Sequence, residues 1–321
     1  MEHPMRLALG QFNQLSDERL QFIKQLGVDD VLLNTPVLPG ETHWEFMDLL
    51  RLRTRCEDAG LRLAAIENVR RSFYEKVMLG LPGRDQQIEH LTTTIRNIAR
   101  AGIPILGYNW MPNGVWRTSR TTPARGGATV TSFDMELAQE APPSHGRTYT
   151  EEEMWANYEY FLKAIMPVAE ETGVKLALHP DDPPVESLGG IARIFRNFQG
   201  FRRAMEIGAS PLHGLAFCHG CWSEMGPGAI EAIRYFGERA KIFYVHFRDV
   251  QGAVPKFQEC FVNEGNNDMF EVMKTLKEVG FTGFLIPDHV PHIVGDTEWG
   301  HRARAHAIGY MTALLEVVNS T

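Results

Sequence analysis

Short apolar runs alternate along the whole chain with longer segments in which apolar residues recur every third or fourth position. The short runs predict buried strands and the longer segments predict amphipathic helices. In Glu151–Glu171, for example, Tyr158, Phe161 and Ile165 share one face of a helix. The pattern predicts eight strands: Arg6–Gly10, Asp30–Asn34, Arg62–Glu67, Pro104–Asn109, Val174–His179, Gly214–Cys218, Ile242–His246 and Gly283–Asp288.

Helix boundaries support this alternation. Thr42 and Glu45 have the spacing of a capping box, which predicts a helix from Thr42 to Ala59. Glycines that end helices precede five of the predicted strands: Gly27, Gly60, Gly102, Gly173 and Gly280. Eight strands with intervening helices predict a (β/α)₈ barrel, the TIM-barrel architecture. A doubly wound open sheet is the alternative, but no G-x-G-x-x-G turn follows the first strand.

One connection is longer than the others. Predicted strands begin roughly 25 to 40 residues apart, whereas the fourth and fifth are separated by about 70, well beyond an ordinary βα unit. The intervening segment, 111–147, is rich in Gly, Pro, Thr and Ser and has no sustained period. We expect one barrel domain over residues 1–321, with 111–147 as a lid or insertion loop on the catalytic face. A disordered or oligomer-contacting excursion is the alternative.

Composition excludes several classes of function. The 321 residues carry a net charge of −8, with a pI near 5.9, which argues against binding to nucleic acid or to an anionic membrane surface. No export signal opens the chain and no apolar window is long enough to span a membrane, so we expect a cytoplasmic protein. Its four cysteines are too few for a disulfide framework, which favours reduced thiols or a metal ligand.

Residues that bind metals end each of the last four predicted strands: His179, Cys218, His246 and Asp288. The carboxyl ends of barrel strands form a ring around the barrel axis, so four consecutive strands can direct these side chains to one point. Nitrogen, sulfur and oxygen donors together suit Zn²⁺, Mn²⁺, Fe²⁺ or Co²⁺. The pattern therefore predicts a divalent metal site.

Other polar residues lie near these strand ends. His289 follows Asp288 directly, and a histidine beside a metal is suited to general acid or base catalysis. Arg248 is expected to take part in catalysis and to pair with a substrate carboxylate. Glu67, Tyr108 and Asn109, at the ends of the third and fourth strands, are expected to contact substrate hydroxyls, although a place in the pocket wall explains Tyr108 equally well.

Several motifs give the chain a resemblance to the mannonate dehydratases, which are xylose-isomerase-like barrels: Tyr108–Pro112 with Trp116–Thr118 close behind, His179–Pro184, Phe217–Cys218, Val245–Arg248, Asn267–Met269 and Pro287–His289. The resemblance implies a homo-oligomeric enzyme of hexuronate catabolism that converts D-mannonate to 2-keto-3-deoxy-D-gluconate, so its partner is a small sugar acid. It also implies that His179, Cys218, His246 and Asp288 bind the metal, usually Mn²⁺. His289 matches a polar residue beside the last ligand.

The chain departs from the family in two places. The family tends to have a catalytic tyrosine shortly before its last helix, but Asp296–Arg302 contains none. It also tends to have a His-His pair after the second strand, where this chain has Asn34–Gly40. Two alternatives therefore stay open: a xylose-isomerase-like isomerase or epimerase acting on a sugar or uronate, and a non-catalytic protein that binds sugar acids.

Overall fold

A closed barrel of eight parallel strands forms the centre of the computed structural model, which describes residues 5–320. Hydrogen bonds between the first and last strands close the sheet, so the open-sheet alternative is wrong. All eight predicted strands are present: β1 (Arg6–Phe12), β2 (Asp30–Asn34), β3 (Arg62–Glu67), β4 (Ile105–Tyr108), β7 (Lys175–Leu178), β10 (His213–Cys218), β11 (Ile242–His246) and β14 (Phe284–Ile286).

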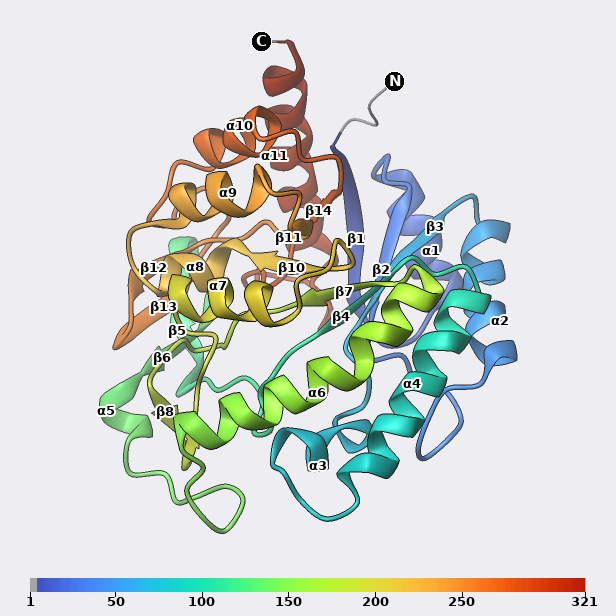
Figure 1. The fold of residues 1–321 in the computed structure, drawn as a ribbon. Helices are drawn as coiled ribbons and strands as arrows, with labels where there is room; N and C mark the ends of the chain where they lie inside the picture. Colours follow the sequence, from blue (N-terminus) through green and yellow to red (C-terminus); the bar gives the residue numbers. More distant parts are fainter. Residues whose placement is uncertain (1–4, 321) are drawn as a thin grey trace.

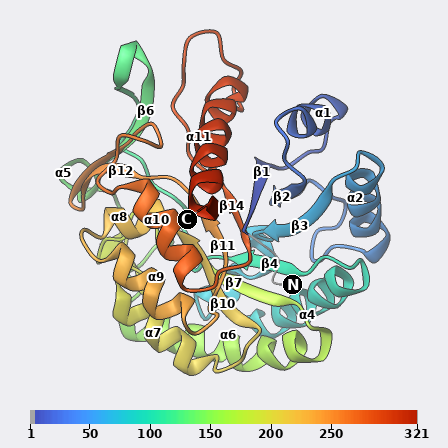
Figure 2. The ribbon, with the colours of Figure 1, turned by 90° about the horizontal axis from the view of Figure 1, so that it is seen from above.

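Helices surround the barrel, as the view along its axis shows (Figure 2). Their buried apolar faces pack on the outer side of the strands and form the larger core of the protein. No helix within residues 5–320 is long and apolar enough to cross a membrane. The main helices are α1 (Asp17–Gln25), α2 (Phe46–Asp58), α4 (Arg84–Arg100), α6 (Glu151–Thr172), α7 (Phe198–Ile207), α9 (Ala229–Gly237), α10 (Met269–Glu278) and α11 (His301–Ser320).

The five glycines predicted to end helices all have positive φ values, between 70° and 76°, as expected of C-terminal caps. The capping box predicted at Thr42 and Glu45 is wrong, because α2 begins only at Phe46 and Glu45 makes no side-chain cap. The preceding Trp44 is fully buried, and its carbonyl accepts a hydrogen bond from Asn97 of α4 at 2.8 Å. The burial of Trp44 and this hydrogen bond explain why residues 42–45 are not part of the helix.

The segment 111–147 has regular structure, contrary to the absence of a period in its sequence. It contains β5 (Ser119–Pro123), β6 (Thr129–Asp134) and the short helix α5 (Met135–Ala138). Strand β6 pairs with β13 (Lys256–Glu259), which in turn pairs with β12 (Val250–Ala253). This second sheet lies beyond the carboxyl ends of the barrel strands (Figure 1). The alternative of a disordered excursion is therefore wrong.

Candidate functional site

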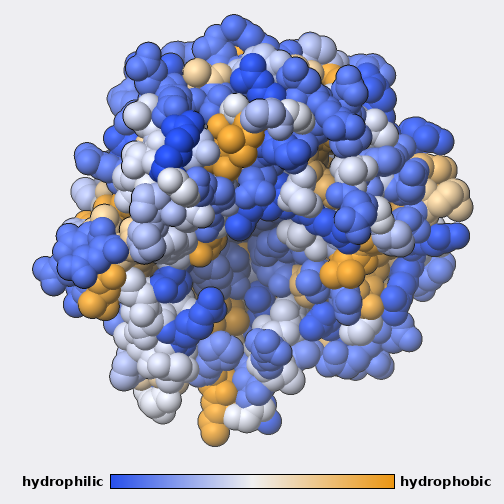
Figure 3. Space-filling view, turned by 90° about the horizontal axis from the view of Figure 1, so that it is seen from below, coloured by the Kyte–Doolittle hydropathy of each residue, from blue (hydrophilic) through white to orange (hydrophobic). Residues whose placement is uncertain are grey.

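A polar cleft opens at the carboxyl ends of the barrel strands. The space-filling view from that side shows a central hollow lined mainly by hydrophilic residues (Figure 3). Its volume is about 480 Å³, which suits a small organic ligand. Its walls include residues from the barrel, the second sheet and the start of α11: Gln11, Asn34, Glu67, Asn68, Asn109, Met111, Val115, Arg117, Arg120, Thr131, His179, Asp182, His246, Glu259, Asp288, His289, Val290, Pro291, His292, Glu298, Trp299, Gly300 and Arg304.

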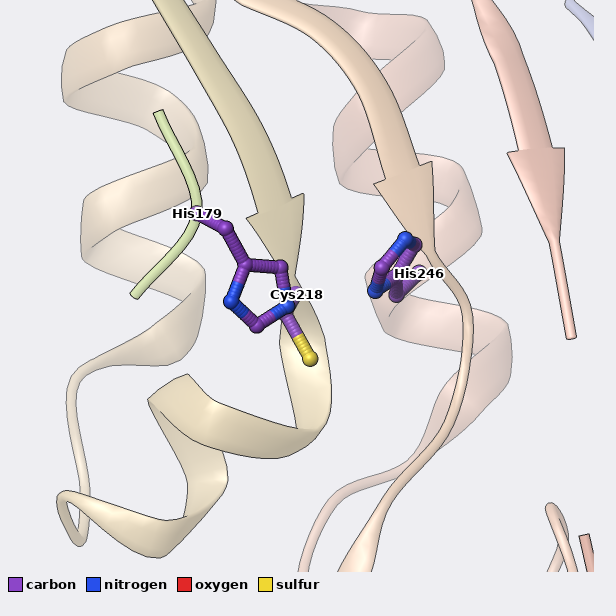
Figure 4. Close-up of side chains that lie close together, drawn as sticks. All are labelled: His179, Cys218 and His246. Carbon is purple, nitrogen blue, oxygen red and sulfur yellow. The ribbon is translucent and has the colours of Figure 1, made fainter. Parts of the chain in front are cut away.

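Three of the four predicted metal-binding side chains meet at the base of this cleft. His179 directly follows β7, Cys218 ends β10 and His246 ends β11. One potential ligand atom from each lies within 4.8 Å of the other two, and all three residues are buried. Figure 4 shows the two imidazole rings and the thiol side by side. Adjacent parallel strands of the barrel hold these three side chains together.

Hydrogen bonds leave one ring nitrogen of each histidine free to bind a metal. Nδ1 of His179 lies 2.8 Å from the carbonyl oxygen of Pro180 and donates to it, so Nε2 keeps its lone pair. Nε2 of His246 lies 2.7 Å from Oε2 of Glu67, whereas its buried Nδ1 has no hydrogen-bond partner. A carboxylate or carbonyl behind the ring is the usual arrangement for histidines that bind metals.

Cys218 and Asp288 supply the other donors. Burial alone would raise the pKa of Cys218, but a hydrogen bond from Cys221 and the charge of Arg248 hold the pKa of this thiol well below its ordinary value. The thiolate is the form that binds metals. Asp288 lies two residues beyond the end of β14, and its Oδ2 is 3.5 Å from Nδ1 of His246. The donor set therefore fits a divalent cation such as Zn²⁺, Mn²⁺, Fe²⁺ or Co²⁺.

Arg248 does not face the cleft as a free cation. It is 2% exposed, and its guanidinium contacts several carboxylates, including Oδ2 of Asp288 at 3.0 Å and Oε2 of Glu259 at 3.1 Å. Glu224 and Asp182 lie 3.0 and 3.2 Å from the same group. The expectation that Arg248 binds a substrate carboxylate is therefore wrong, because every side of the guanidinium is already occupied within the protein.

Arg117, which lies in one of the motifs of the sequence but for which no role was predicted, completes this buried ionic cluster. It contacts both oxygens of Asp182 and lies 2.7 Å from Glu259, and its side chain is 5% exposed. The residue comes from the 111–147 segment. The cluster therefore joins that segment to the side of the barrel that carries the predicted metal ligands.

Tyr108 does not contact the cleft either. Its hydroxyl lies 2.8 Å from the hydroxyl of Tyr158 on α6 and 2.8 Å from Nε2 of His213. Side chains alternate between the inside and the outside of a barrel strand, and Tyr108 points outward into the helix layer. The expectation of a substrate contact from Tyr108 is wrong, and its role lies in packing.

Glu67 and Asn109, in contrast, line the cleft as expected. Amide side chains continue this wall: Nδ2 of Asn109 donates to Oδ1 of Asn68, and Nδ2 of Asn34 donates to Oε1 of Gln11. Gln11 and Asn68 have φ values of 60° and 63°, a strained backbone conformation that is commonest at functional sites. The wall opposite the metal-binding residues thus presents hydrogen-bonding groups suited to hydroxyls.

His289 and Glu298 are two titratable side chains that border the cleft. Nδ1 of His289 lies 2.7 Å from Oε1 of Glu259, and about a third of its side chain is exposed toward the cleft that it lines. Glu298 lines the same cleft from Asp296–Arg302, the stretch that lacks the family's tyrosine. Tyr310 lies within α11 and is not part of the cleft wall.

Comparison with known proteins decides the family. The model of the D-mannonate dehydratase (UxuA) family matches residues 5–148 and 144–321. The chain belongs to this family. Mannonate dehydratase of Thermotoga maritima is 34% identical over 325 residues, covering 89% of this chain and 87% of the relative. Mannonate dehydratase 2 of Halalkalibacterium halodurans is 31% identical, with 98% of this chain and all of that relative covered.

Solved structures agree with this family membership. The crystal structure of mannonate dehydratase from Streptococcus suis serotype 2 superposes with a TM-score of 0.90 at 32% identity, covering 98% of this chain and 94% of that one. A structure of L-ribulose 3-epimerase has a TM-score of 0.63 at 16% identity, covering 98% of this chain and 96% of that chain. The second likeness shows that the fold is shared with xylose-isomerase-like barrels, and nothing more.

Proposed function

We propose that the protein is a divalent-metal-dependent dehydratase that converts D-mannonate to 2-keto-3-deoxy-D-gluconate in hexuronate catabolism. His179, Cys218, His246 and Asp288 would hold the cation, with Mn²⁺ as the first candidate. One observation carries the proposal: nitrogen and sulfur donors from three adjacent strands lie within 4.8 Å of one another at the base of the cleft. Membership in the mannonate dehydratase family supplies the reaction.

Dehydration removes the proton on C2 and the hydroxyl on C3, and the resulting enol tautomerises to the 2-keto acid. A bound divalent cation would stabilise the negative charge that builds on the substrate's carboxylate as the C2 proton leaves. We infer that His289 either removes the C2 proton or protonates the departing C3 hydroxyl. The 2.7 Å contact between its Nδ1 and Oε1 of Glu259, which fixes the orientation of the ring, supports this role. Glu298 is the second candidate for proton transfer, in place of the missing tyrosine.

The amide wall gives the cleft a way to position the sugar chain. Gln11, Asn34, Asn68 and Asn109 all border the cleft, and each carries both a donor and an acceptor. We propose that they bind the hydroxyls of the substrate together with Glu67. The 111–147 segment would cover the same substrate as part of one domain over residues 1–321, because Met111, Val115 and Arg120 already border the cleft.

A metal-removal experiment tests this function. Protein treated with EDTA and then supplied with Mn²⁺ is expected to yield from D-mannonate a product lighter by one water, and the metal-free protein is expected to yield none. The Cys218→Ser variant should lose Mn²⁺ binding and product formation together. Cys56→Ala is the matched control, because Cys56 is an equally buried free cysteine on α2. An isomer of unchanged mass would indicate an epimerase instead, and turnover without metal would contradict the proposal.

A further inference from the structure

Arg304 is a buried arginine of the cleft that has no carboxylate partner among the residues that the structure describes. It lies in the first turn of α11 and is 7% exposed. Nε donates to the carbonyl oxygen of Trp299 at 2.9 Å, and Nη1 donates to that of Pro287 at 3.0 Å. Within residues 5–320 no carboxylate oxygen lies within 4.0 Å of its guanidinium, and Nη2 has no hydrogen-bond partner.

The neighbouring buried arginines are different. Arg117 and Arg248 are similarly buried, and each contacts at least three carboxylates. Arg120, the other arginine of the cleft without an ion pair in the described part of the chain, is exposed on β5, so water can solvate its charge. Arg304 alone among these four combines burial with the absence of a counter-ion.

An unpaired buried charge destabilises a protein, so it needs an explanation. Burial lowers the pKa of Arg304 to about 10, although the charges of Asp288 and Asp296 act in the opposite direction. Neutral backbone carbonyls replace only part of the lost hydration. A ligand that brings a negative charge into the cleft would supply the missing partner.

We propose that Arg304 binds the carboxylate of the sugar acid through the Nη2 side of its guanidinium. The inference rests on the proposed function, since it assumes that the substrate of this cleft is an acid. The hydrogen bond from Arg304 to the carbonyl oxygen of Pro287 holds the guanidinium close to Asp288, one of the proposed metal ligands. A carboxylate bound there lies where negative charge increases when the C2 proton leaves, so Arg304 would contribute both to binding and to the rate.

A ligand pair that differs in charge alone tests the proposal. D-Mannonate and its neutral carboxamide, D-mannonamide, are titrated into the Mn²⁺-loaded protein with and without the Arg304→Gln substitution. Both proteins also carry His289→Asn, so that mannonate is not consumed during the titration. We expect the variant to bind mannonate about 30- to 100-fold more weakly, as for the loss of a buried charge-assisted contact, and to bind mannonamide within about threefold of wild type. Equal weakening of both ligands, or unchanged mannonate binding, would overturn the proposal.

Arg302→Gln is the matched control. Arg302 lies on the same helix and also donates to a backbone carbonyl, that of Val294 at 2.9 Å, but it is exposed and does not border the cleft. This variant should bind both ligands as wild type does. If Arg304→Gln does not fold, Arg304→Lys replaces it, because lysine keeps the charge but loses the two-pronged geometry. The expected effect is then about tenfold weaker binding of mannonate with unchanged binding of mannonamide.

The two hypotheses fail in different ways. Wild-type protein that binds mannonate without forming a product contradicts dehydration, while the comparison of mannonate with mannonamide still decides the role of Arg304. An Arg304→Gln variant that forms product with unchanged KM and kcat contradicts the role of Arg304 alone. Wild-type protein that binds mannonamide as tightly as mannonate also contradicts that role, because no residue then recognises the negative charge.

Discussion

Oε2 of Glu67 lies 2.7 Å from Nε2 of His246, and the two side chains come from strands on opposite sides of the barrel. The hydroxyl of Tyr244 donates to the same carboxylate oxygen at 3.0 Å. This contact assigns the proton of His246 to Nε2 and leaves Nδ1 free for a metal. In the proposed metal site, Glu67 would therefore orient His246 without itself belonging to the cluster of donors.

Glu67→Ala is therefore expected to weaken Mn²⁺ binding by about 10- to 100-fold, because His246 loses the group that fixes its proton and its ring. Competition with a fluorescent chelator measures the affinity. Asn109→Ala is the control, since Asn109 borders the same cleft but bonds to Asn68 and not to His246. Unchanged metal affinity in Glu67→Ala would show that His246 is not oriented in this way.

His289→Asn should separate metal binding from chemistry. The imidazole that transfers a proton is lost, whereas the donors on β7, β10 and β11 remain. We expect kcat to fall by at least about 100-fold, with Mn²⁺ affinity within about threefold of wild type. Steady-state kinetics and a metal titration on the same preparation measure both quantities. A variant with wild-type kcat would exclude His289 from proton transfer.

Arg248→Met should affect stability more than substrate recognition. Removal of the guanidinium leaves Asp182, Glu224 and Glu259 without one of their buried partners. The free energy of unfolding is expected to fall by about 3–5 kcal/mol, as measured by urea denaturation. Arg96→Met is the control: it breaks an exposed ion pair with Glu171 and should change stability little. A stable Arg248→Met variant with only a raised KM would support a substrate-binding role instead.

The buried, neutral His213 is expected to make the free energy of unfolding fall as the pH falls. Burial lowers the pKa of His213 to about 3, while Nδ1 donates to Gly208 and Nε2 accepts from Tyr108. Between the unfolded-state pKa of about 6.5 and this value, only the unfolded chain binds the proton, so stability falls as the pH falls. The loss is at most about 1.4 kcal/mol per pH unit.

The His213→Gln variant isolates this contribution. The variant should be less stable than wild type at pH 7, because glutamine does not fill the buried place of the imidazole ring equally well. Glutamine retains an acceptor for Tyr108, but it does not titrate, so it lacks the pH-dependent loss of stability expected of His213. The difference in unfolding free energy should then narrow as the pH falls from 6.5 toward 4.5. Urea denaturation at several pH values measures this difference. A gap that stays constant or widens on acidification would show that His213 is not held neutral.

The barrel could be predicted from the sequence because each strand carries its own local signal. A run such as Ile242–His246 is mostly apolar and is buried on both faces, and a glycine such as Gly173 marks the helix end before a strand. Strand ends also indicated which potential metal ligands lie close together, because their place in a barrel follows from topology. The second sheet had no such signal: four of the six residues of β6 are polar, and its partner β13 lies more than 100 residues further along the chain.

The direction in which a side chain points was the second feature that could not be predicted from the sequence. Tyr108 and Asn109 are neighbours at the end of one strand, yet only Asn109 faces the cleft. Arg248 and Arg304 have the same chemistry in the sequence, and only the structure shows that carboxylates surround the first and not the second. Which ionic groups neutralise one another depends on contacts between distant segments, so an arginine with carboxylate partners cannot be told from one without them by sequence alone.

Mass analysis of the product formed from D-mannonate, with and without metal, tests the central claim most directly. The account predicts that EDTA-treated protein is inactive. Restoring Mn²⁺ should yield a 2-keto acid lighter than mannonate by one water, and the Cys218→Ser variant should not respond to the metal. The same product formed by metal-free protein, or no product from the metal-loaded wild type, would contradict a metal-dependent dehydratase at His179, Cys218, His246 and Asp288.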